Sequence, residues 1–284
     1  MNEKCLIIKK VKDALIKAST NFRADQKEAY LNAINNESNP SAKWVLEILI
    51  KNSLVAAKNS SPLCDDTGVP HLFLELGNNM EINNKLIESI NTGVAEGLRA
   101  LPGRPMAIKG NDIERLEQSV GLDEDPGALI PAPLIIKPVN EDVTRLHVLL
   151  QGGGPEIRGK TYKVFHKHSF HEIISQLVHW INEGTSLLGC TPCTPAIGIG
   201  RSHYEATVLM IEAMIKGNFS IQSEIEKEIT KRVNDSNVGP LGIGGDTTAL
   251  ATFLKVGPQR ASGVRIVCYR LCCCMEPRIA SVLI

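Results

Sequence analysis

The sequence reads SPLCDDTGVP from Ser61 to Pro70, so a single thiol stands beside two carboxylates in a turn bounded by proline and glycine. A thiolate binds soft metals and a carboxylate moves protons, so this stretch is a candidate metal ligand next to an acid–base group. The alternative is a surface turn that contains a small buried thiol. The stretch alone favours that alternative, and the choice between the two depends on the rest of the chain.

The chain has 284 residues, with 31 basic and 31 acidic side chains. This length is enough for one large domain or two. We expect a single domain over residues 1–284, with residues 1–60 as its helical lead-in. No run of like charge is long enough to form a patch for nucleic acid or a membrane, so neither is an expected partner.

The amino terminus reads MNEKCLIIKK and offers only three consecutive apolar residues, far fewer than the core of a signal peptide. No apolar run approaches the roughly 18 residues of a membrane-spanning helix. We therefore expect the protein in the cytoplasm. In that reducing compartment its eight cysteines are not expected to form a disulfide framework, which leaves ligation, catalysis or burial as their roles.

Apolar periodicity predicts helices interleaved with short strands. The expected fold class is therefore mixed α/β (α+β), with a central mixed sheet flanked by helices behind the helical amino-terminal lead-in. The polar segment 109–127 is expected to be a long functional loop. The expected helices cover about residues 5–58, 82–100, 169–183 and 223–233, with another after residue 200, and the expected strands cover 71–76, 134–137, 145–150 and 263–271.

Glycine-rich stretches follow several of these elements. Gly152, Gly153 and Gly154 come directly after an expected strand and offer bare N–H groups to an anion, although a flexible hairpin would read the same way. The Gly198-Ile199-Gly200 stretch suits a close-packed cofactor at the start of a helix, yet it lacks the third glycine of the dinucleotide motif. In the stretch 239–248, Asp246 stands where a nucleotide phosphate loop needs a lysine.

The cysteines allow more than one kind of site. Zinc favours two Cys-x-x-Cys pairs, whereas only Cys190 and Cys193 form one, and Pro192 between them is awkward for a redox dithiol. An iron–sulfur cluster takes thiolates from distant loops and can leave one iron without a cysteine. Cys64, Cys190 and one of the cysteines at 272–274 fit that arrangement better than they fit zinc.

Five motifs then occur in a specific order and spacing. They read PLCxDTG at 62–68, GGG at 152–154, CxP at 190–192, GPxGxGGxTT at 239–248, and a cysteine ahead of RxA at 278–280. With these motifs, nearly the whole chain resembles the alpha subunit, or amino-terminal half, of the class I iron–sulfur hydro-lyases, the fumarate hydratase and L(+)-tartrate dehydratase family.

The resemblance implies a 4Fe-4S cluster held by three cysteines, whose open iron acts as a Lewis acid on the substrate. Two ligand positions carry over to Cys64 and Cys190. The third is Cys274 by the motif downstream of it, or Cys272 by its spacing from residues 261–262, and we favour Cys274. The implied reaction is the reversible dehydration of a small hydroxy-dicarboxylate.

The resemblance also implies roles for other residues. Asp66 would protonate the departing hydroxide, because hydroxide is a poor leaving group. Arg104 would grip a substrate carboxylate as a bidentate pair, and the N–H groups of Gly153 and Gly154 would bind the same anion. Asp65 occupies a position that is usually glutamine in the family, so we expect it at the substrate and expect it to distinguish this protein's substrate from those of its relatives.

The family's remaining site residues belong to its other half, so the resemblance implies a beta subunit and a hetero-oligomer, with an alpha–alpha dimer as a further option. A histidine that relatives carry before the last cysteine is absent, and Gln259-Arg260 lies in its region. Two alternatives stay open: a non-catalytic iron–sulfur or small-acid binding or sensor protein of the same fold, and a zinc-stabilised structural domain.

Overall fold

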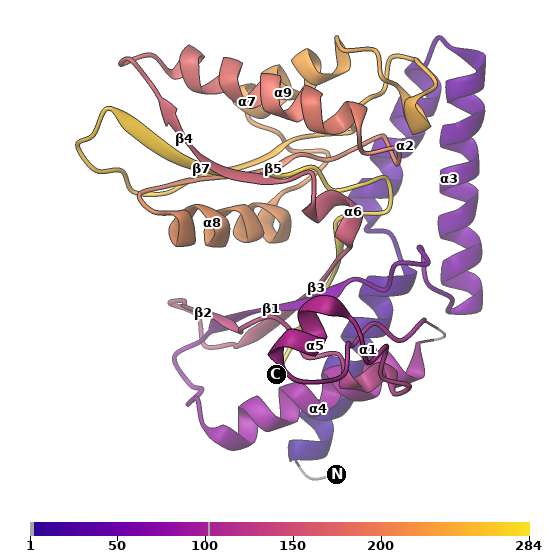
Figure 1. The fold of residues 1–284 in the computed structure, drawn as a ribbon, viewed down its shortest axis with the longest axis vertical. Coiled ribbons are helices and arrows are strands. Elements are labelled where there is room, and N and C mark those ends of the chain that lie inside the picture. The colour runs from indigo at the N-terminus through magenta and orange to yellow at the C-terminus, as the bar shows by residue number, and fades with distance from the viewer. Residues whose placement is uncertain (1–2, 102) are drawn as a thin grey trace. The chain divides into compact units, whose positions relative to one another are not determined.

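The computed structural model describes residues 3–101 and 103–284, which divide into two compact units (Figure 1). The first unit comprises residues 1–21, 53–152 and 278–284, and the second comprises residues 22–52 and 153–277. Each unit therefore assembles segments that are far apart in the sequence. The expectation that residues 1–284 form a single domain stays a prediction.

The first unit is built on a four-stranded sheet with the order β2-β1-β3-β8. β2 runs parallel to β1, whereas β3 is antiparallel to both β1 and β8. The elements are α1 (Glu3–Thr20), β1 (Val69–Leu76), α4 (Asn84–Ala100), α5 (Asp112–Glu117), the 3-10 turn η1 (Pro126–Ala128), β2 (Ile135–Pro138), β3 (Arg145–Gln151) and β8 (Arg278–Leu283).

Helices α1 and α4 cover one face of this sheet because each carries an apolar stripe at helical spacing. Gly93 lets the two helices approach closely, since a Cβ there would lie 2.7 Å from the Ile8 carbonyl oxygen and the Val11 Cβ. The buried cluster includes Val11 and Leu15 of α1, Ile90 and Val94 of α4, and Leu72, Leu74, Leu146 and Val148 of the sheet.

The second unit is built on another four-stranded sheet, with the order β4-β7-β5-β6. β7 is antiparallel to β4 and β5, and β6 is parallel to β5. The elements are α2 (Ala24–Asn36), α6 (Gly153–Glu156), β4 (Lys160–Phe165), α7 (Phe170–Ser186), β5 (Ala196–Gly200), α8 (His203–Lys216), α9 (Glu224–Asn234), η2 (Pro240–Gly242), β6 (Phe253–Val256) and β7 (Val264–Arg270). Helix α3 (Pro40–Asn59) begins in this unit and ends in the first.

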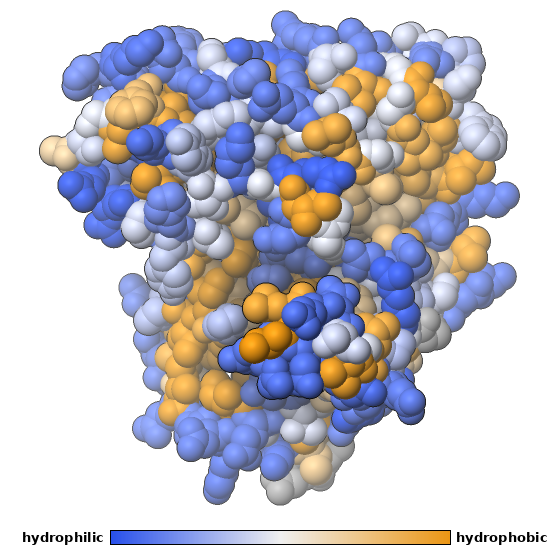
Figure 2. Space-filling model, viewed as in Figure 1, coloured by the Kyte–Doolittle hydropathy of each residue, from blue (hydrophilic) through white to orange (hydrophobic). Residues whose placement is uncertain are grey.

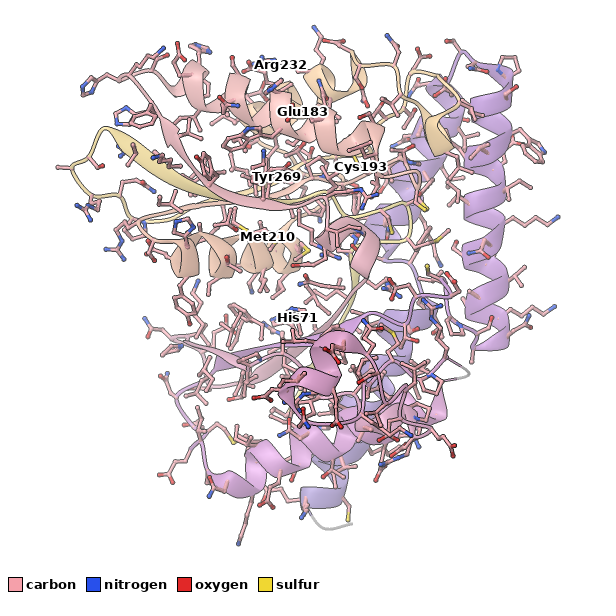
Figure 3. All side chains as sticks on the ribbon, in the orientation of Figure 1. His71, Glu183, Cys193, Met210, Arg232 and Tyr269 are labelled. Carbon is pink, nitrogen blue, oxygen red and sulfur yellow. The ribbon has the colours of Figure 1, made fainter. Side chains whose placement is uncertain are left out.

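Helices cover both faces of this second sheet, with α7 and α9 on one side and α8 on the other (Figure 1). Figure 3 shows Tyr269 of β7 on the α7 side, where its hydroxyl donates to the Trp180 carbonyl at 3.1 Å, and Met210 on the α8 side. Gly198 allows α8 to lie directly on β5, because a Cβ there would be 2.1 Å from the Ala206 carbonyl oxygen. This glycine therefore serves close packing of a helix on a strand.

The structure confirms the mixed α/β class, the helical lead-in and most of the expected elements, with several differences of arrangement. The strands form two mixed sheets, where one central sheet was expected. Strands β4, β5, β6 and β8 were not predicted, and residues 198–200 end β5, whereas we expected them to open a helix. Within the expected loop 109–127 the chain forms helix α5. No helix of the described residues has the length and apolar character needed to cross a bilayer.

Candidate active site

The stretch that contains Cys64 precedes β1 as an irregular turn in the first unit, and a buried arginine holds it. Arg278, only 2% exposed at the start of β8, donates from Nη1 to the Asp66 carbonyl at 2.6 Å and to the Thr67 carbonyl at 3.2 Å. Gly68 has φ +79°, and a Cβ there would lie 2.6 Å from Arg278 Nη2. The glycine is thus required both for the backbone conformation and for the approach of the arginine.

The two carboxylates of this turn have different surroundings. Asp65 is exposed, and its Oδ1 lies 3.5 Å from the half-buried Cys64 thiol, which donates to it. Asp66 is half-buried, and its Oδ1 accepts a hydrogen bond from the Gly68 N–H at 2.9 Å, which closes an Asx turn. The structure therefore fixes the direction of the Asp66 side chain through the backbone of the turn and places Asp65 beside the thiol.

The structure brings the backbone of Arg104 beside the same turn. The Thr67 hydroxyl donates to the Arg104 carbonyl at 3.4 Å, and a Cβ at Gly103 would lie 2.9 Å from that hydroxyl. The Arg104 side chain is exposed. The backbone of Arg104 therefore lies beside the turn that carries Asp65 and Asp66.

In the second unit, two cysteines from distant motifs lie together. The backbone N–H of Cys274 donates to the Cys190 carbonyl at 2.8 Å, and the N–H of Thr194 is shared between the Leu271 and Cys272 carbonyls, each at 2.9 Å. The residues after β7 are therefore hydrogen-bonded to both ends of the segment 190–194. Cys190 is exposed, and Cys274 is 6% exposed.

Side chains of α2 hold the loop of the carboxyl-terminal cysteines from the other side. The hydroxyl of Tyr30, which is fully buried, donates to the Cys274 carbonyl at 2.6 Å, and Gln26 donates to the Glu276 carbonyl at 3.3 Å. Burial, followed by the nearby Cys274 and Cys273, raises the pKa of Tyr30 well above its usual value. The phenol therefore remains a hydrogen-bond donor to this loop throughout the physiological range.

The two cysteines considered for the third ligand position are both buried and make different contacts. Cys272 is completely buried with φ +47°, its sulfur lies 3.5 Å from the Met214 sulfur on α8, and burial raises the pKa of its thiol. Cys274 instead shares a backbone hydrogen bond with Cys190. The backbone of Cys274 is therefore bonded to Cys190 and the Cys272 sulfur packs on α8, and the choice of Cys274 over Cys272 as the third ligand stays a prediction.

The difference in burial predicts different reactivities of the thiols. In the metal-free, reduced chain at pH 8, we expect a small alkylating reagent to modify Cys190 at least about tenfold faster than Cys272 or Cys193, because the thiolate is the nucleophile. Cys272 and Cys193 are fully buried, and burial raises the pKa of Cys193 to about 12. Fragmentation mass spectrometry of timed samples measures the rates, and urea should make them equal. Equal rates in the native chain would contradict the burial of Cys272.

A buried ion pair ties the cysteine loop to the glycine-rich α6. Arg270, 1% exposed, donates from Nη2 to both Glu276 carboxylate oxygens at 3.1 Å, and its Nη1 pairs with Glu156. Burial opposes the charged form, but Glu276 and Glu156 outweigh it and raise the pKa of Arg270. Gly153 and Gly154, exposed at the start of α6, are thus linked through Arg270 to the loop of Cys274.

Breaking this pair should destabilise the protein strongly. We expect Glu276→Gln or Arg270→Met to lower the free energy of unfolding by about 3–5 kcal/mol, because each leaves one buried charge without its main partner. Glu156→Gln is the matched control: its side chain is 67% exposed, so a loss of at most about 1 kcal/mol is expected. Urea unfolding followed by circular dichroism measures all three, and equal small losses would refute a structural role for the Arg270–Glu276 pair.

The glycine-rich loop at 238–248 supports the Cys190 segment from a third side. The Thr191 hydroxyl donates to the Gly239 carbonyl at 2.5 Å and accepts from the Gly242 N–H at 3.2 Å. The Thr248 hydroxyl accepts from the Gly239 N–H at 3.0 Å, and the Thr248 carbonyl accepts from the Cys193 N–H at 2.8 Å. The loop therefore fixes the segment 190–194 through hydrogen bonds to Thr191 and Cys193.

The N–H groups of this loop do bind an anion, but the anion belongs to the chain. The Glu37 carboxylate, on a residue that is 7% exposed, accepts from the Asp246 N–H at 2.9 and 3.1 Å and from the Thr247 N–H at 3.0 Å. Successive backbone N–H groups form such nests for phosphate in other proteins. The Glu37 carboxylate occupies the position that a phosphate takes in such nests.

The expected cysteine ligands are distributed over the two units, with Cys64 in the first and Cys190 and Cys274 in the second. All eight cysteines are thiols, and none forms a disulfide in the described part of the chain. Across residues 3–101 and 103–284, no group of three or more His, Cys, Asp or Glu side chains is arranged to hold a metal ion. The chemistry of the donor set nevertheless fits an iron–sulfur cluster, since all three donors are soft sulfurs on irregular segments.

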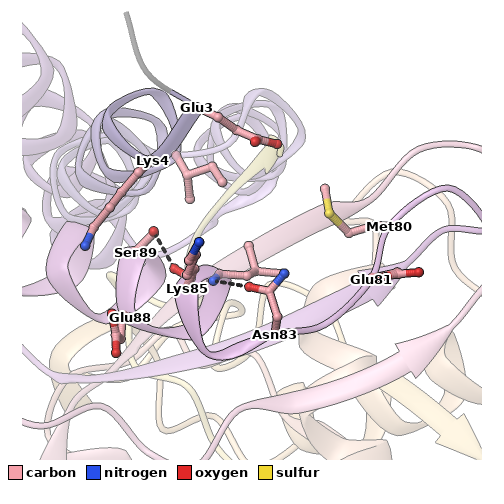
Figure 4. Close-up of a pocket in the computed structure, with 10 residues that line it drawn as sticks. Glu3, Lys4, Met80, Glu81, Asn83, Lys85, Glu88 and Ser89 are labelled. Carbon is pink, nitrogen blue, oxygen red and sulfur yellow. Dashed lines mark hydrogen bonds between the residues drawn. The ribbon is translucent and has the colours of Figure 1, made fainter.

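A pocket of about 470 Å³ lies elsewhere, between the amino-terminal ends of α1 and α4 (Figure 4). Its lining mixes acidic and basic side chains and contains none of the expected site residues. The lining residues are Glu3, Lys4, Ile7, Met80, Glu81, Asn83, Lys85, Leu86, Glu88 and Ser89.

Several residues that shape the site were not singled out from the sequence. Tyr30, Glu37 and Arg270 each hold a cysteine-bearing or glycine-rich loop through one or more hydrogen bonds. Arg270 and Glu276 do carry a signal in the sequence, because two opposite charges flank a run of apolar and cysteine residues. Tyr30 and Glu37 carry no such signal in the sequence. Tyr30 lies in the polar helix α2, and Glu37 is the residue directly after it.

Comparison with known proteins confirms the family resemblance. The model of the fumarate hydratase (Fumerase) family matches residues 8–282. A Methanocaldococcus jannaschii protein, provisionally named L(+)-tartrate dehydratase subunit alpha, is 30% identical over 262 residues, which cover 86% of this chain and 88% of that protein. The L(+)-tartrate dehydratase subunits alpha of Escherichia coli K12 and Shigella sonnei are each 21% identical over 239 residues, or 81% of this chain and 75% of theirs. The chain belongs to the fumarate hydratase family of hydro-lyases.

Proposed function

We propose that this chain is the cluster-binding alpha subunit of a hydro-lyase that reversibly dehydrates a small hydroxy-dicarboxylate of the malate or tartrate type. The observation that carries the proposal is the hydrogen bond between the Cys274 N–H and the Cys190 carbonyl, because it joins two sulfur-bearing motifs that are far apart in the sequence. Membership of the fumarate hydratase family supports the reaction type.

We assign the ligation of a 4Fe-4S cluster to Cys64, Cys190 and Cys274. When bound, the cluster supplies an open iron that acts as a Lewis acid toward hydroxyl and carboxylate oxygens. The Cys190 and Cys274 loops are held by hydrogen bonds to their main-chain atoms. One example is the bond from the Tyr30 hydroxyl to the Cys274 carbonyl. The assignment therefore rests on donor chemistry, loop support and family membership.

Asp66 is the proposed proton donor and acceptor. Its carboxylate is oriented by the Gly68 N–H at 2.9 Å, and its main chain is held by Arg278. In the dehydration direction it would protonate the departing hydroxide, and in the hydration direction it would take the proton back from water. A proton carrier acts only within hydrogen-bond reach of the reacting group. A carboxylate that the backbone holds in one direction, as it holds Asp66, suits this role.

Arg104, Gly153 and Gly154 are the proposed carboxylate-binding groups, and Asp65 the proposed substrate-discriminating group. Arg104 offers a planar pair of donors suited to a carboxylate, and its backbone lies beside the Cys64 turn. Asp65 is exposed and contacts the Cys64 thiol, so a carboxylate stands where an anionic substrate would approach. We infer that this charge selects against a second substrate carboxylate at that position.

The assembly that we propose contains a beta subunit, as the alpha names of the relatives suggest, and a reducing cytoplasm would suit its eight thiols. The test is to co-express the chain with the beta-type subunit from the same source, reconstitute iron and sulfide anaerobically, and assay malate, tartrate and methyl-substituted analogues for alkene formation. Turnover of at least one of these acids is expected.

Asp65 supports a second candidate, a non-catalytic iron–sulfur binding or sensor protein, because a carboxylate beside Cys64 opposes an anionic substrate. The same assay separates the two functions. A fully loaded complex that turns over none of the acids would favour the binding protein over the hydro-lyase.

A further inference from the structure

Residues 103–133 leave the body of the first unit between α4 and β2 as a folded excursion. Its base is closed by an antiparallel bridge in which the Lys109 N–H donates to the Gly121 carbonyl at 3.1 Å and the Asp123 N–H donates to the Ala107 carbonyl at 2.8 Å. Helix α5 lies within it and begins with a capping box, in which the Asn111 side chain and the Glu114 side chain satisfy each other's backbone N–H groups.

The excursion is also attached to the elements on either side of it. Arg99 of α4 forms a bidentate pair with Asp125, at 2.9 and 2.7 Å, and the Ala132 N–H donates to the Pro70 carbonyl at 2.9 Å. Its first residues lie beside the Cys64 turn through the Thr67–Arg104 hydrogen bond. The excursion is thus held in place at both ends, and one end carries a proposed substrate-binding residue.

The excursion nevertheless exposes large apolar side chains. Helix α5 has only six residues and buries none of them, so it gains little from packing within this chain. Figure 2 shows hydrophobic atoms beside hydrophilic ones on the surface over α5. The exposed apolar side chains are Ile113 (66%), Leu116 (85%), Val120 (46%), Leu122 (51%) and Ile130 (82%), which we call the apolar set.

The charges around the apolar set are mostly acidic. Residues 103–133 contain three basic side chains, Arg104, Lys109 and Arg115, and six acidic ones, Asp112, Glu114, Glu117, Asp123, Glu124 and Asp125. Asp112 pairs with Arg115 and Asp125 with Arg99, which leaves four acidic side chains against two basic ones. In a symmetric contact with a second copy of this chain, acidic side chains would face acidic side chains, which is unfavourable. The surface instead fits a different protein whose apolar contact area is bordered by basic side chains.

We propose that the apolar set is the docking surface for the beta subunit. The inference rests on the proposed function, which supplies that partner, and on the alpha-subunit names of the relatives. Docking there covers the apolar side chains that this chain leaves exposed. The excursion 103–133 also contains Arg104. Binding of the beta subunit to the excursion would therefore stabilise the position of this proposed substrate-binding residue.

The test is the affinity of the purified chain for the purified beta-type subunit, measured by calorimetry for the wild type and for the double variant Ile113→Ser/Leu116→Ser. Both side chains are exposed, so the variant should fold normally, and a thermal unfolding curve checks this. Ile221→Ser in the second unit, at a site that is 77% exposed, is the matched control. We expect the double variant to bind at least about 100-fold more weakly, and the control to bind as the wild type does.

Charge gives a second readout. Glu117→Lys/Glu124→Lys should slow association and reduce its dependence on salt, because the acidic border attracts basic groups of the partner. Unchanged affinity of the double variant, or no complex with the wild-type chain, would overturn the proposal. So would a double variant that loses self-association but still binds the beta-type subunit normally. A complex that depends on the apolar set but turns over no acid would leave docking intact and refute the proposed function.

Discussion

Replacing Cys64 or Cys190 with serine is expected to abolish the broad visible absorbance of the anaerobically reconstituted protein. A serine hydroxyl is a hard and weakly acidic donor, so it cannot replace a thiolate on iron at neutral pH. The hydrogen bond between Cys190 and Cys274 runs between backbone atoms, and Arg278 binds the Cys64 turn through the Asp66 and Thr67 carbonyls, so neither sulfur is needed for these bonds. The fold should therefore survive the change, and circular dichroism should look unaltered.

The matched control for these variants is Cys5→Ser, at an exposed position of α1. It should keep the full absorbance. Cys274→Ser should behave like the Cys190 variant, whereas Cys272→Ser should keep the absorbance and lose some stability, because the buried Cys272 sulfur contacts Met214. A complete cluster in either the Cys64 or the Cys190 variant would remove that residue from the ligand set.

Asp66→Asn is expected to keep the cluster and lower turnover about 10²- to 10⁴-fold, the usual contribution of a positioned proton carrier. The amide oxygen of asparagine can still accept the hydrogen bond from the Gly68 N–H, so the turn should keep its geometry. The measurement is the rate of alkene formation by the loaded alpha–beta complex, together with its visible spectrum. An unchanged rate would exclude Asp66 from the chemistry.

Asp65→Asn provides the neighbouring control. Asp65 is exposed and accepts from the Cys64 thiol, whereas Asp66 accepts from the Gly68 N–H. Substitution of Asp65 should therefore preserve most of the turnover. We expect it to alter the relative KM of mono- and dicarboxylic acids instead, because it removes a negative charge from the approach to the site. The contrast between the two adjacent residues separates proton transfer from charge selection.

The sequence alone predicted most of the fold because long helices carry strong apolar periodicity. Helices α4 and α7 were expected within a few residues of their observed bounds, and each packs an apolar stripe on a sheet. Strand β4 was missed because its residues, KTYKVF, are mostly exposed, and β6 because four residues give too short a pattern. Residues 198–200 were misassigned because their glycines serve helix packing on a strand, which looks the same in sequence as a ligand loop.

The candidate site was predictable only in part, for a similar reason. Motif residues such as Cys190 and Asp66 stand out by type and spacing, so the sequence alone names them as candidates, and their roles stay predictions. The groups that hold them in place come from segments distant in sequence, as with Tyr30 against Cys274 and Arg278 against the Asp66 carbonyl. Such contacts depend on tertiary packing, and no local pattern encodes them.

The supports around the carboxyl-terminal cysteines bear on the order in which the protein matures. Tyr30 and the Arg270–Glu276 pair hold this loop through oxygen and nitrogen atoms, so its shape does not depend on a metal. Small zinc domains differ, because there metal binding supplies the free energy of folding. In this chain we expect folding to come first and cluster insertion to follow, so that a damaged cluster can be replaced on a protein that stays folded.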